Sequence, residues 1–207
     1  QPIQKAQDAD AAAELRRKIY PFILRRLKGE VLKDLPPKVE QSLYVEMNAE
    51  QKAHYENRRR YYQQVIEGEI ERQGLAKSQF AILEALLALR QIATVPEAKT
   101  EGAVKSAKTE RLLEALDEAM ANGHKCLVFT NFLAGVEQIS QALEERDIPH
   151  LSMTGATSDR QALVERFQNS SSIKVFVMTL TTGGVGLNLT AAGAVFILDP
   201  WWNQSAE

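Results

Sequence analysis

The stretch VFVMTLTTGGVGLNL, residues 175–189, decides the fold class of this chain. Its first four residues are large and apolar without interruption, which is typical of a strand covered on both faces in the middle of a parallel sheet. The glycines that follow allow the backbone to approach a ligand closely. A GGxG segment is also explained by a tight strand-to-helix turn, and it matches neither GxGxxG nor GxxxxGK[ST]. The stretch therefore predicts a central strand that leads into a candidate ligand loop.

Strand-like and helix-like segments alternate around this stretch. Strands are predicted at Lys125–Thr130, near His150–Thr154, at Ile173–Thr179 and at Ala194–Asp199. Helices are predicted at Lys108–Asn122, around Val136–Leu143 and at Asp159–Gln168, the last with a capping box of Ser158 and Gln161. Such alternation indicates an open parallel α/β sheet with helices on its faces.

The region before Ala107 follows a different pattern. One strand is predicted at Lys38–Met47, and Asn48 has the character of an N-cap for a long helix that runs to about Gln73. A second helix is predicted from Ser78 to Thr94. Two long helices in succession predict a hairpin that protrudes from the α/β core. The polar segment 99–105 lacks periodicity and is expected to be a mobile linker.

Composition excludes several classes of protein. The chain has 207 residues, 44% of them hydrophobic, and no run approaches the ~18 apolar residues of a transmembrane helix, so no membrane partner is expected. A net charge of −2 argues against a domain that holds nucleic acid by bulk charge alone. Cys126, the single cysteine, lies in an apolar run, which predicts a buried, inert thiol and a reducing, intracellular compartment. The three histidines have no metal-ligand spacing.

Four loops follow the predicted strands, and all are rich in glycine, hydroxyl and amide side chains. They lie at residues 130–132, 154–157, 179–189 and 199–203. In an open parallel sheet, ligands bind at the carboxyl ends of the strands, where such loops meet. Backbone N–H groups and short polar side chains can hydrogen-bond phosphates there without net positive charge. The loops therefore predict one shared binding edge.

Six elements in order make the chain resemble the SWI/SNF-like branch of the superfamily 2 helicase-related ATPases. They are PFILRR (21–26) with LPPK (35–38), LRQI (89–92) with Pro96, SAK (106–108) with GHKCLVFT (123–130), TGAT (154–157) with Arg160, the glycine-rich loop (179–189) as motif V, and DPWWN (199–203). A chance match of six elements in the same order is improbable.

The resemblance implies the second, C-terminal RecA-like lobe of an ATPase that translocates on double-stranded DNA. It implies an inter-lobe segment at 1–37, a strand plus helical-hairpin protrusion at 38–98, a mobile linker at 99–107, and a RecA-like core at 108–207 that stops before motif VI. ATP and Mg²⁺ would be held across a cleft with the N-terminal RecA-like lobe. The phosphate-loop lysine, the Mg²⁺ ligands and the arginine finger are expected outside residues 1–207, so this fragment alone is predicted to be inactive.

Site residues are carried over by position within the matching motifs. The residues implied to bind ATP are Gly184, Gly186 and Asn188. The residues implied to contact DNA are Thr130, Asn131, Gly155, Thr157, Arg160, Thr179 and Trp202. No catalytic or metal-binding residue is assigned. The run of arginines at 58–60 is left out, because consecutive residues spread around a helix and indicate a solvated face.

Two alternative interpretations belong to other classes. An RNA helicase lobe is disfavoured by the FILRR (22–26) and WWN (201–203) elements, which ordinary DEAD-box second lobes lack. A non-catalytic α/β interaction module is favoured by the absence of motifs I, II and VI from these residues. For the ATPase, the compartment is the bacterial cytoplasm and nucleoid, or the nucleus in a eukaryote.

Overall fold

The computed structural model describes residues 9–23, 39–183 and 186–200, in two units that divide at residues 43 and 44. In the first unit, helix α2 (Ala9–Ile19) has three basic residues in its last turn, Arg16, Arg17 and Lys18, and continues into the 3₁₀ turn η1 (Tyr20–Phe22). The second unit contains all the remaining elements. No described helix is long and apolar enough to cross a membrane.

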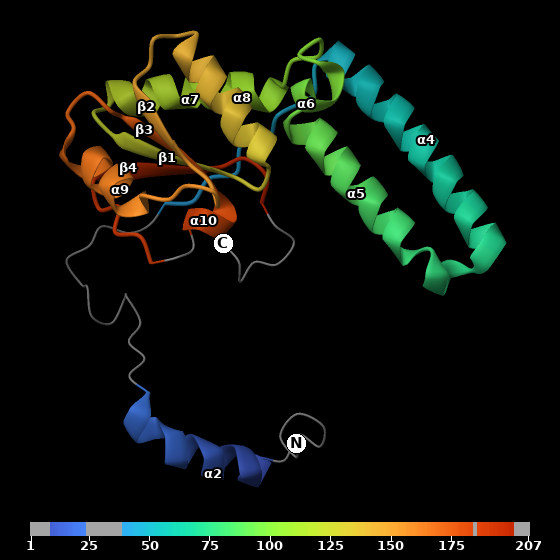
Figure 1. Ribbon diagram of the computed structural model, residues 1–207, viewed down its shortest axis with the longest axis horizontal. Coiled ribbons are helices and arrows are strands. Elements are labelled where there is room, and N and C mark those ends of the chain that lie inside the picture. The colour runs from blue at the N-terminus through green and yellow to red at the C-terminus, as the bar shows by residue number, and fades with distance from the viewer. Residues whose placement is uncertain (1–8, 24–38, 184–185, 201–207) are drawn as a thin grey trace. The chain divides into compact units, whose positions relative to one another are not determined.

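A four-stranded sheet forms the centre of the second unit (Figure 1). Its strands are β1 (Lys125–Thr130), β2 (His150–Met153), β3 (Val175–Thr179) and β4 (Ala192–Ile197), in the spatial order β2-β3-β1-β4. Every pairing is parallel, and each of the four strands predicted after Ala107 is present within two residues of its predicted bounds. The predicted parallel α/β sheet is therefore confirmed.

Helices cover both faces of the sheet. Helices α7 (Ala107–Ala121) and α8 (Leu133–Glu144) pack on one face, where Leu116 and Leu143 are fully buried. Helix α9 (Arg160–Asn169) packs on the other face, where the rings of Phe167 and Phe176 lie 5.3 Å apart. Because both faces are covered, every residue of β3 is buried, as its uninterrupted apolar run predicts.

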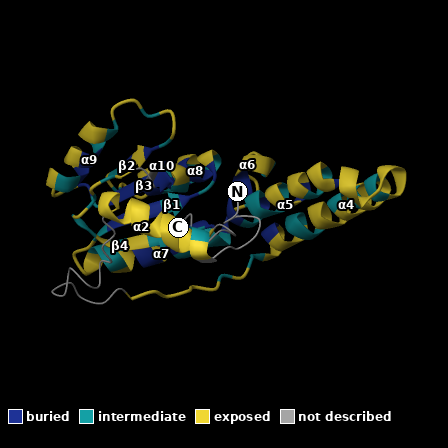
Figure 2. Ribbon diagram, turned by 90° about the horizontal axis from the view of Figure 1, so that it is seen from below, coloured by how far each residue is buried: buried dark blue, intermediate teal, exposed yellow. Residues whose placement is uncertain are grey.

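The predicted helical hairpin is also present. Helix α4 (Ala49–Gln73) and helix α5 (Gln79–Thr94) lie side by side, joined through Gly74, which has φ +80°, and the turn η2 (Leu75–Lys77). The hairpin projects away from the sheet and is largely exposed (Figure 2). Asn48 caps α4 as predicted, because its side chain accepts the N–H of Gln51 at 2.8 Å. The arginines 58–60 are exposed, as a solvated face requires.

Two local predictions are wrong. The described part of the predicted strand Lys38–Met47, residues 39–47, forms no strand; Val39 is 87% and Tyr44 97% exposed, so these two side chains pack on nothing. The predicted capping box of Ser158 and Gln161 is replaced by Asp159, whose carboxylate accepts the N–H of Ala162 at 3.1 Å. A carboxylate one residue nearer the helix is the better acceptor for the N-terminal amides.

Gln51 joins the hairpin to the core through buried hydrogen bonds. Its side chain is 1% exposed, donates to the carbonyl of Ile92 at 3.0 Å and accepts the N–H of Ala107 at 3.2 Å. Ser106, which caps α7, donates its hydroxyl to the carbonyl of Thr94 at 2.7 Å. Residues 99–107, predicted to be a mobile linker, include the end of the short helix α6 (Glu97–Thr100) and the first residue of α7, and they carry this hydrogen-bonded junction.

Cys126 fits the same core. It is fully buried in β1, and burial raises the pKa of its thiol to about 11. The thiolate is therefore scarce near neutral pH, which agrees with the predicted inert cysteine.

Gln51→Ala should destabilise the second unit. The change leaves the buried carbonyl of Ile92 without its partner, at about 1–3 kcal/mol, and also removes the acceptor of the partly buried N–H of Ala107. Urea unfolding should show a lower midpoint for this variant than for Gln64→Ala, the same change on an exposed position of α4. Equal midpoints for the two variants would contradict the assigned role of Gln51.

Candidate functional site

The four strands end at one edge of the sheet. In the β1–β3 ladder Thr130 is the register partner of Thr179, and in the β2–β3 ladder Met153 is the partner of Met178. The loops that follow β1, β2 and β3 therefore start next to one another, and the segment after β4 joins them (Figure 1). This arrangement confirms the predicted shared edge.

Thr130 and Thr179, both predicted to contact DNA, lie below the surface of this edge. Thr130 is 1% exposed, and its hydroxyl accepts the N–H of Phe132 at 3.2 Å. A Cβ on Gly135 would lie 2.6 Å from that hydroxyl, so only glycine allows the first turn of α8 to pack here. Thr179 is 5% exposed and bonds the hydroxyl of Thr182 at 2.6 Å. Both threonines therefore shape the loops from beneath.

The loop after β2 brings three predicted residues together. Thr157 accepts the N–H of Thr154 through its hydroxyl at 3.0 Å, which closes a tight turn. Gly155 is exposed at the tip of this turn, and Arg160 donates to its carbonyl at 3.1 Å. A guanidinium has five N–H donors, so Arg160 retains donors for a ligand while it holds the turn.

The glycine-rich loop begins with one helical turn, α10 (Leu180–Gly183). Gly186 has φ +58° and is exposed, with nothing within 4 Å of a Cβ built on it. Asn188 has an exposed side chain, and its carbonyl accepts the side-chain amide of Gln168 at 3.2 Å. Gln168 also accepts the N–H of Ala191 at 2.7 Å. The predicted residues Gly184 and Trp202 lie outside the described residues.

A buried polar cluster holds the end of β4. Asp199 is 4% exposed, and one carboxylate oxygen accepts the N–H of Asn131 at 2.9 Å. The amide of Asn131 donates to the carbonyl of Asp199. Lys108 on α7 donates to the carbonyl of Leu198 at 3.3 Å. Asn131, predicted as a DNA contact, is thereby tied to the neighbouring strand.

Arg90 extends this cluster to the hairpin. Its guanidinium donates from α5 to the carbonyl of Pro200 at 3.1 Å. No functional role was predicted for Arg90, Lys108, Asp199 or Gln168 from the sequence. Arg90 and Lys108 lie 110 and 90 residues from their partners, a distance over which periodicity carries no signal. For Asp199, the sequence signal was its position at the start of the DPWWN motif, residues 199–203.

Burial shifts the pKa values of two charged groups here. Burial raises the pKa of the Asp199 carboxyl, and hydrogen bonds from Asn131 and Thr130 and the charge of Lys108 oppose that shift. Burial lowers the pKa of the Lys108 ammonium; the negative charge of Asp199 opposes this shift, and the positive charge of Arg90 adds to it.

Within residues 9–23, 39–183 and 186–200, no group of three or more His, Cys, Asp and Glu residues is placed to hold a metal ion.

The raised pKa of Asp199 makes stability depend on pH. A folded-state pKa above the unfolded value of about 3.9 means that the native state binds the proton more tightly. The free energy of unfolding should therefore fall as pH rises between those two values, and Asp199→Asn should remove this slope. Urea midpoints across this pH range test it, with Asp147→Asn on an exposed turn as the control. Parallel curves for wild type and Asp199→Asn would refute the assignment.

Comparisons with known proteins agree with this geometry. The helicase conserved C-terminal domain model matches residues 107–207, and the SNF2-related domain model matches residues 1–98. An uncharacterized ATP-dependent helicase of Mycoplasma pneumoniae is 36% identical over 93% of this chain, which spans only 18% of that relative.

Two solved structures from Sulfolobus solfataricus are also similar. The SWI2/SNF2 ATPase C-terminal domain is 30% identical with a TM-score of 0.70, over 81% of this chain and 74% of that one. The SWI2/SNF2 ATPase core in complex with double-stranded DNA is 32% identical with a TM-score of 0.72, over 98% of this chain and 44% of that one. The chain therefore belongs to the SWI2/SNF2 ATPase family, in which it corresponds to the C-terminal RecA-like domain.

Proposed function

We propose that this chain supplies the second ATPase lobe of an ATP-dependent translocase on double-stranded DNA. The observation that carries the proposal is the convergence of four polar loops on one edge of a parallel sheet, in a chain of the SWI2/SNF2 family. The similarity over 98% of this chain to an ATPase core in complex with double-stranded DNA supports the choice of nucleic acid. In this proposal residues 1–37 join the two lobes, residues 38–98 carry the hairpin, and residues 108–207 form the core.

The glycine-rich loop is the proposed contribution to ATP binding. Gly186 leaves open space at an exposed, left-handed position, where a phosphate or ribose can approach the backbone. Asn188 presents an exposed amide, and Gln168 holds its backbone from α9. These groups suit a nucleotide held between two lobes. We assign Gly184 to the same loop by position in the motif.

Mg²⁺ and the phosphate-loop lysine are assigned to the other lobe. Mg²⁺ in phosphoryl transfer is held by acidic side chains and phosphate oxygens, and the motifs that supply them in the resembling family match no stretch of residues 1–207. When bound, ATP and Mg²⁺ supply the transferred phosphoryl group and neutralise its charge. The residues of this lobe, Gly186 and Asn188 among them, orient the nucleotide from the loop after β3.

The loop after β2 is the proposed DNA-tracking surface. Gly155, Thr157 and Arg160 lie together, and Arg160 retains N–H donors for a phosphate. Contacts of this kind bind the phosphates of the DNA backbone and do not depend on the base sequence, which suits an enzyme that moves along DNA. Thr130, Thr179 and Asn131 are assigned as positioning residues beneath this surface, because their described hydrogen bonds are internal. Trp202 is also proposed to contact DNA, on the basis of its position in the DPWWN motif alone.

Residues 1–207 alone should not hydrolyse ATP. An arginine finger is worth ~10³–10⁵ in rate in related phosphoryl transfer, and this chain also lacks a phosphate-loop lysine. With a net charge of −2, its DNA affinity should stay within the ~10⁻⁴–10⁻⁶ M of non-specific binding and weaken with salt. A phosphate-release assay with and without duplex DNA, beside the parent protein, tests this. DNA-stimulated hydrolysis by the isolated chain would refute the proposal.

Arg160→Ala in the parent protein should weaken DNA binding selectively. Loss of one phosphate contact should lower DNA affinity about threefold to tenfold and reduce the slope of log K against log salt by about one. The KM for ATP should stay near its wild-type value. Arg166→Ala removes the same charge from an exposed position of α9 and serves as the control. Equal loss in both variants would show a bulk charge effect instead of a contact by Arg160.

A further inference from the structure

One side chain at the end of α9 holds the segment that leads into β4. The amide nitrogen of Gln168 donates to the carbonyl of Asn188 at 3.2 Å and to the hydroxyl of Thr190 at 3.0 Å. Its amide oxygen accepts the N–H of Ala191 at 2.7 Å. These partners lie 20 to 23 residues further along the chain, so Gln168 fixes the segment 188–191 from a separate element.

The chemistry of this contact requires a side-chain amide. The segment offers a carbonyl, a hydroxyl and an N–H, so the group that holds it needs both a donor and an acceptor. An amide carries both, whereas a carboxylate only accepts and an ammonium only donates. Glutamate at position 168 would turn an oxygen toward the carbonyl of Asn188 and lose that hydrogen bond. Gln168 therefore has a role that an equally long acidic side chain cannot fill.

Lys125 fixes the turn from which Gln168 projects. Its ammonium, at the start of β1, donates to the carbonyls of Phe167, of Gln168 at 3.3 Å and of Ser170 at 2.7 Å. A cation is favoured at the carbonyl end of a helix, where the last carbonyls have no partner within the helix. The centre of the buried Phe167 ring lies 5.1 Å from the same ammonium. The last turn of α9 is therefore held to the sheet, and the Gln168 amide starts from a fixed position.

The opposite end of α9 is attached to the turn after β2. Arg160, the first residue of the helix, donates to the carbonyl of Gly155 at 3.1 Å, and Asp159 caps the helix by accepting the N–H of Ala162. Helix α9 has 10 residues, so about 15 Å of continuous helix separates its two ends. The proposed DNA turn and the proposed nucleotide loop are thus bonded to opposite ends of one helix.

We propose that Gln168 is a positioning residue for the nucleotide loop, and that α9 links DNA contact at the Gly155 turn to Asn188 through it. The inference rests on the proposed function, because it connects the two surfaces assigned there. DNA phosphates bound at the turn fix the end of α9 that Lys125 does not hold. The Gln168 amide extends that order to the segment 188–191, from which the nucleotide is contacted.

The test replaces Gln168 by glutamate in the parent protein. Gln168→Glu keeps the length of the side chain and an acceptor for the N–H of Ala191, and it puts an oxygen against the carbonyl of Asn188. The KM for ATP should rise about threefold to tenfold, as expected for one lost hydrogen bond with local repulsion. The stimulation of ATP hydrolysis by duplex DNA should fall by a similar factor, whereas the affinity for DNA should not change. A purely structural role predicts a lower urea midpoint with KM and stimulation at wild-type values.

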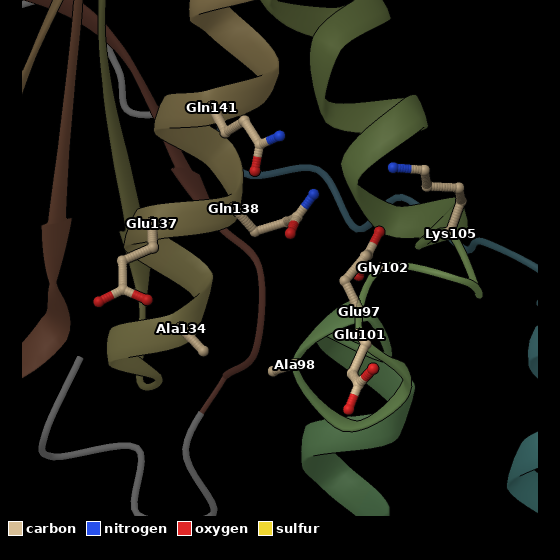
Figure 3. A pocket seen from close by; sticks show the side chains of 9 residues that line it. All are labelled: Glu97, Ala98, Glu101, Gly102, Lys105, Ala134, Glu137, Gln138 and Gln141. Atoms are coloured by element: carbon tan, nitrogen blue, oxygen red, sulfur yellow. The ribbon is translucent and has the colours of Figure 1, made fainter.

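Gln138→Glu is the matched control. Gln138 is half-buried on α8, as Gln168 is on α9, and it lines a pocket of about 330 Å³ beside the segment after α5 (Figure 3). The change adds the same charge on the opposite face of the sheet from α9, and should leave the KM for ATP and the stimulation by DNA unchanged. Gln168→Ala removes all three hydrogen bonds without adding a charge. It should reproduce both effects, and it covers the case in which Gln168→Glu does not fold.

The outcomes separate this inference from the proposed function. If duplex DNA stimulates the wild-type parent protein, Gln168→Glu and Gln168→Ala equally, at an unchanged KM for ATP, the inference is overturned and the proposed function stands. A raised KM with full stimulation would overturn the link through α9. If duplex DNA does not stimulate the wild-type parent protein, the proposed function fails and the inference fails with it. Equal changes in Gln138→Glu and Gln168→Glu would show an effect of charge alone and would also overturn the inference.

Discussion

Parallel pairing of β1 with both β3 and β4 is the constraint on which the rest of this structure depends. Parallel strands bring all their carboxyl ends to one edge, so four loops from distant parts of the sequence meet there. The same pairing requires a crossover between consecutive strands, and the crossover helices cover both faces of the sheet. The complete burial of β3 and the convergence of the polar loops are therefore two consequences of one arrangement.

Beneath this edge, polar groups are used for positioning. The hydroxyls of Thr130 and Thr179 are buried and bond groups two and three residues further along their own loops, and one oxygen of the buried Asp199 carboxylate bonds the N–H of Asn131. These hydrogen bonds favour one arrangement of the loops, because moving a loop would leave the buried groups unpaired. The residues that remain exposed, Gly155 and Asn188 among them, are then presented on a fixed base.

The hairpin is tied to the core at two places that lie far apart in sequence. Gln51 connects its first helix to the start of α7, and Arg90 connects its second helix to the segment after β4. The junction near Gln51 also includes Ser106, whose N–H is accepted by the carboxylate of Glu97 and whose hydroxyl bonds the carbonyl of Thr94. The hairpin, the start of α7 and the segment after β4 are thus linked through hydrogen bonds within one unit.

Elements whose sequence signal is local were predictable without the structure. The apolar run of β3, the periodic faces of α7 and α8, and the Asn48 cap were all predictable, because each depends on neighbours within a few residues. The order of the motifs then determined the family and the positions of the candidate loops. The strand predicted at Lys38–Met47 failed because apolar alternation does not show whether a partner strand is available.

The accessibility of the polar loop residues, by contrast, is set by the packing of distant segments. Thr130, Thr179 and Asn131 are hydroxyl and amide residues in loops of the right composition, and nothing in the sequence shows that their hydrogen bonds are internal. The roles of Arg90, Lys108 and Gln51 likewise depend on partners 41 to 110 residues away. Burial and long-range hydrogen bonding are properties of the packed chain, because they arise only when distant segments exclude water from a common space.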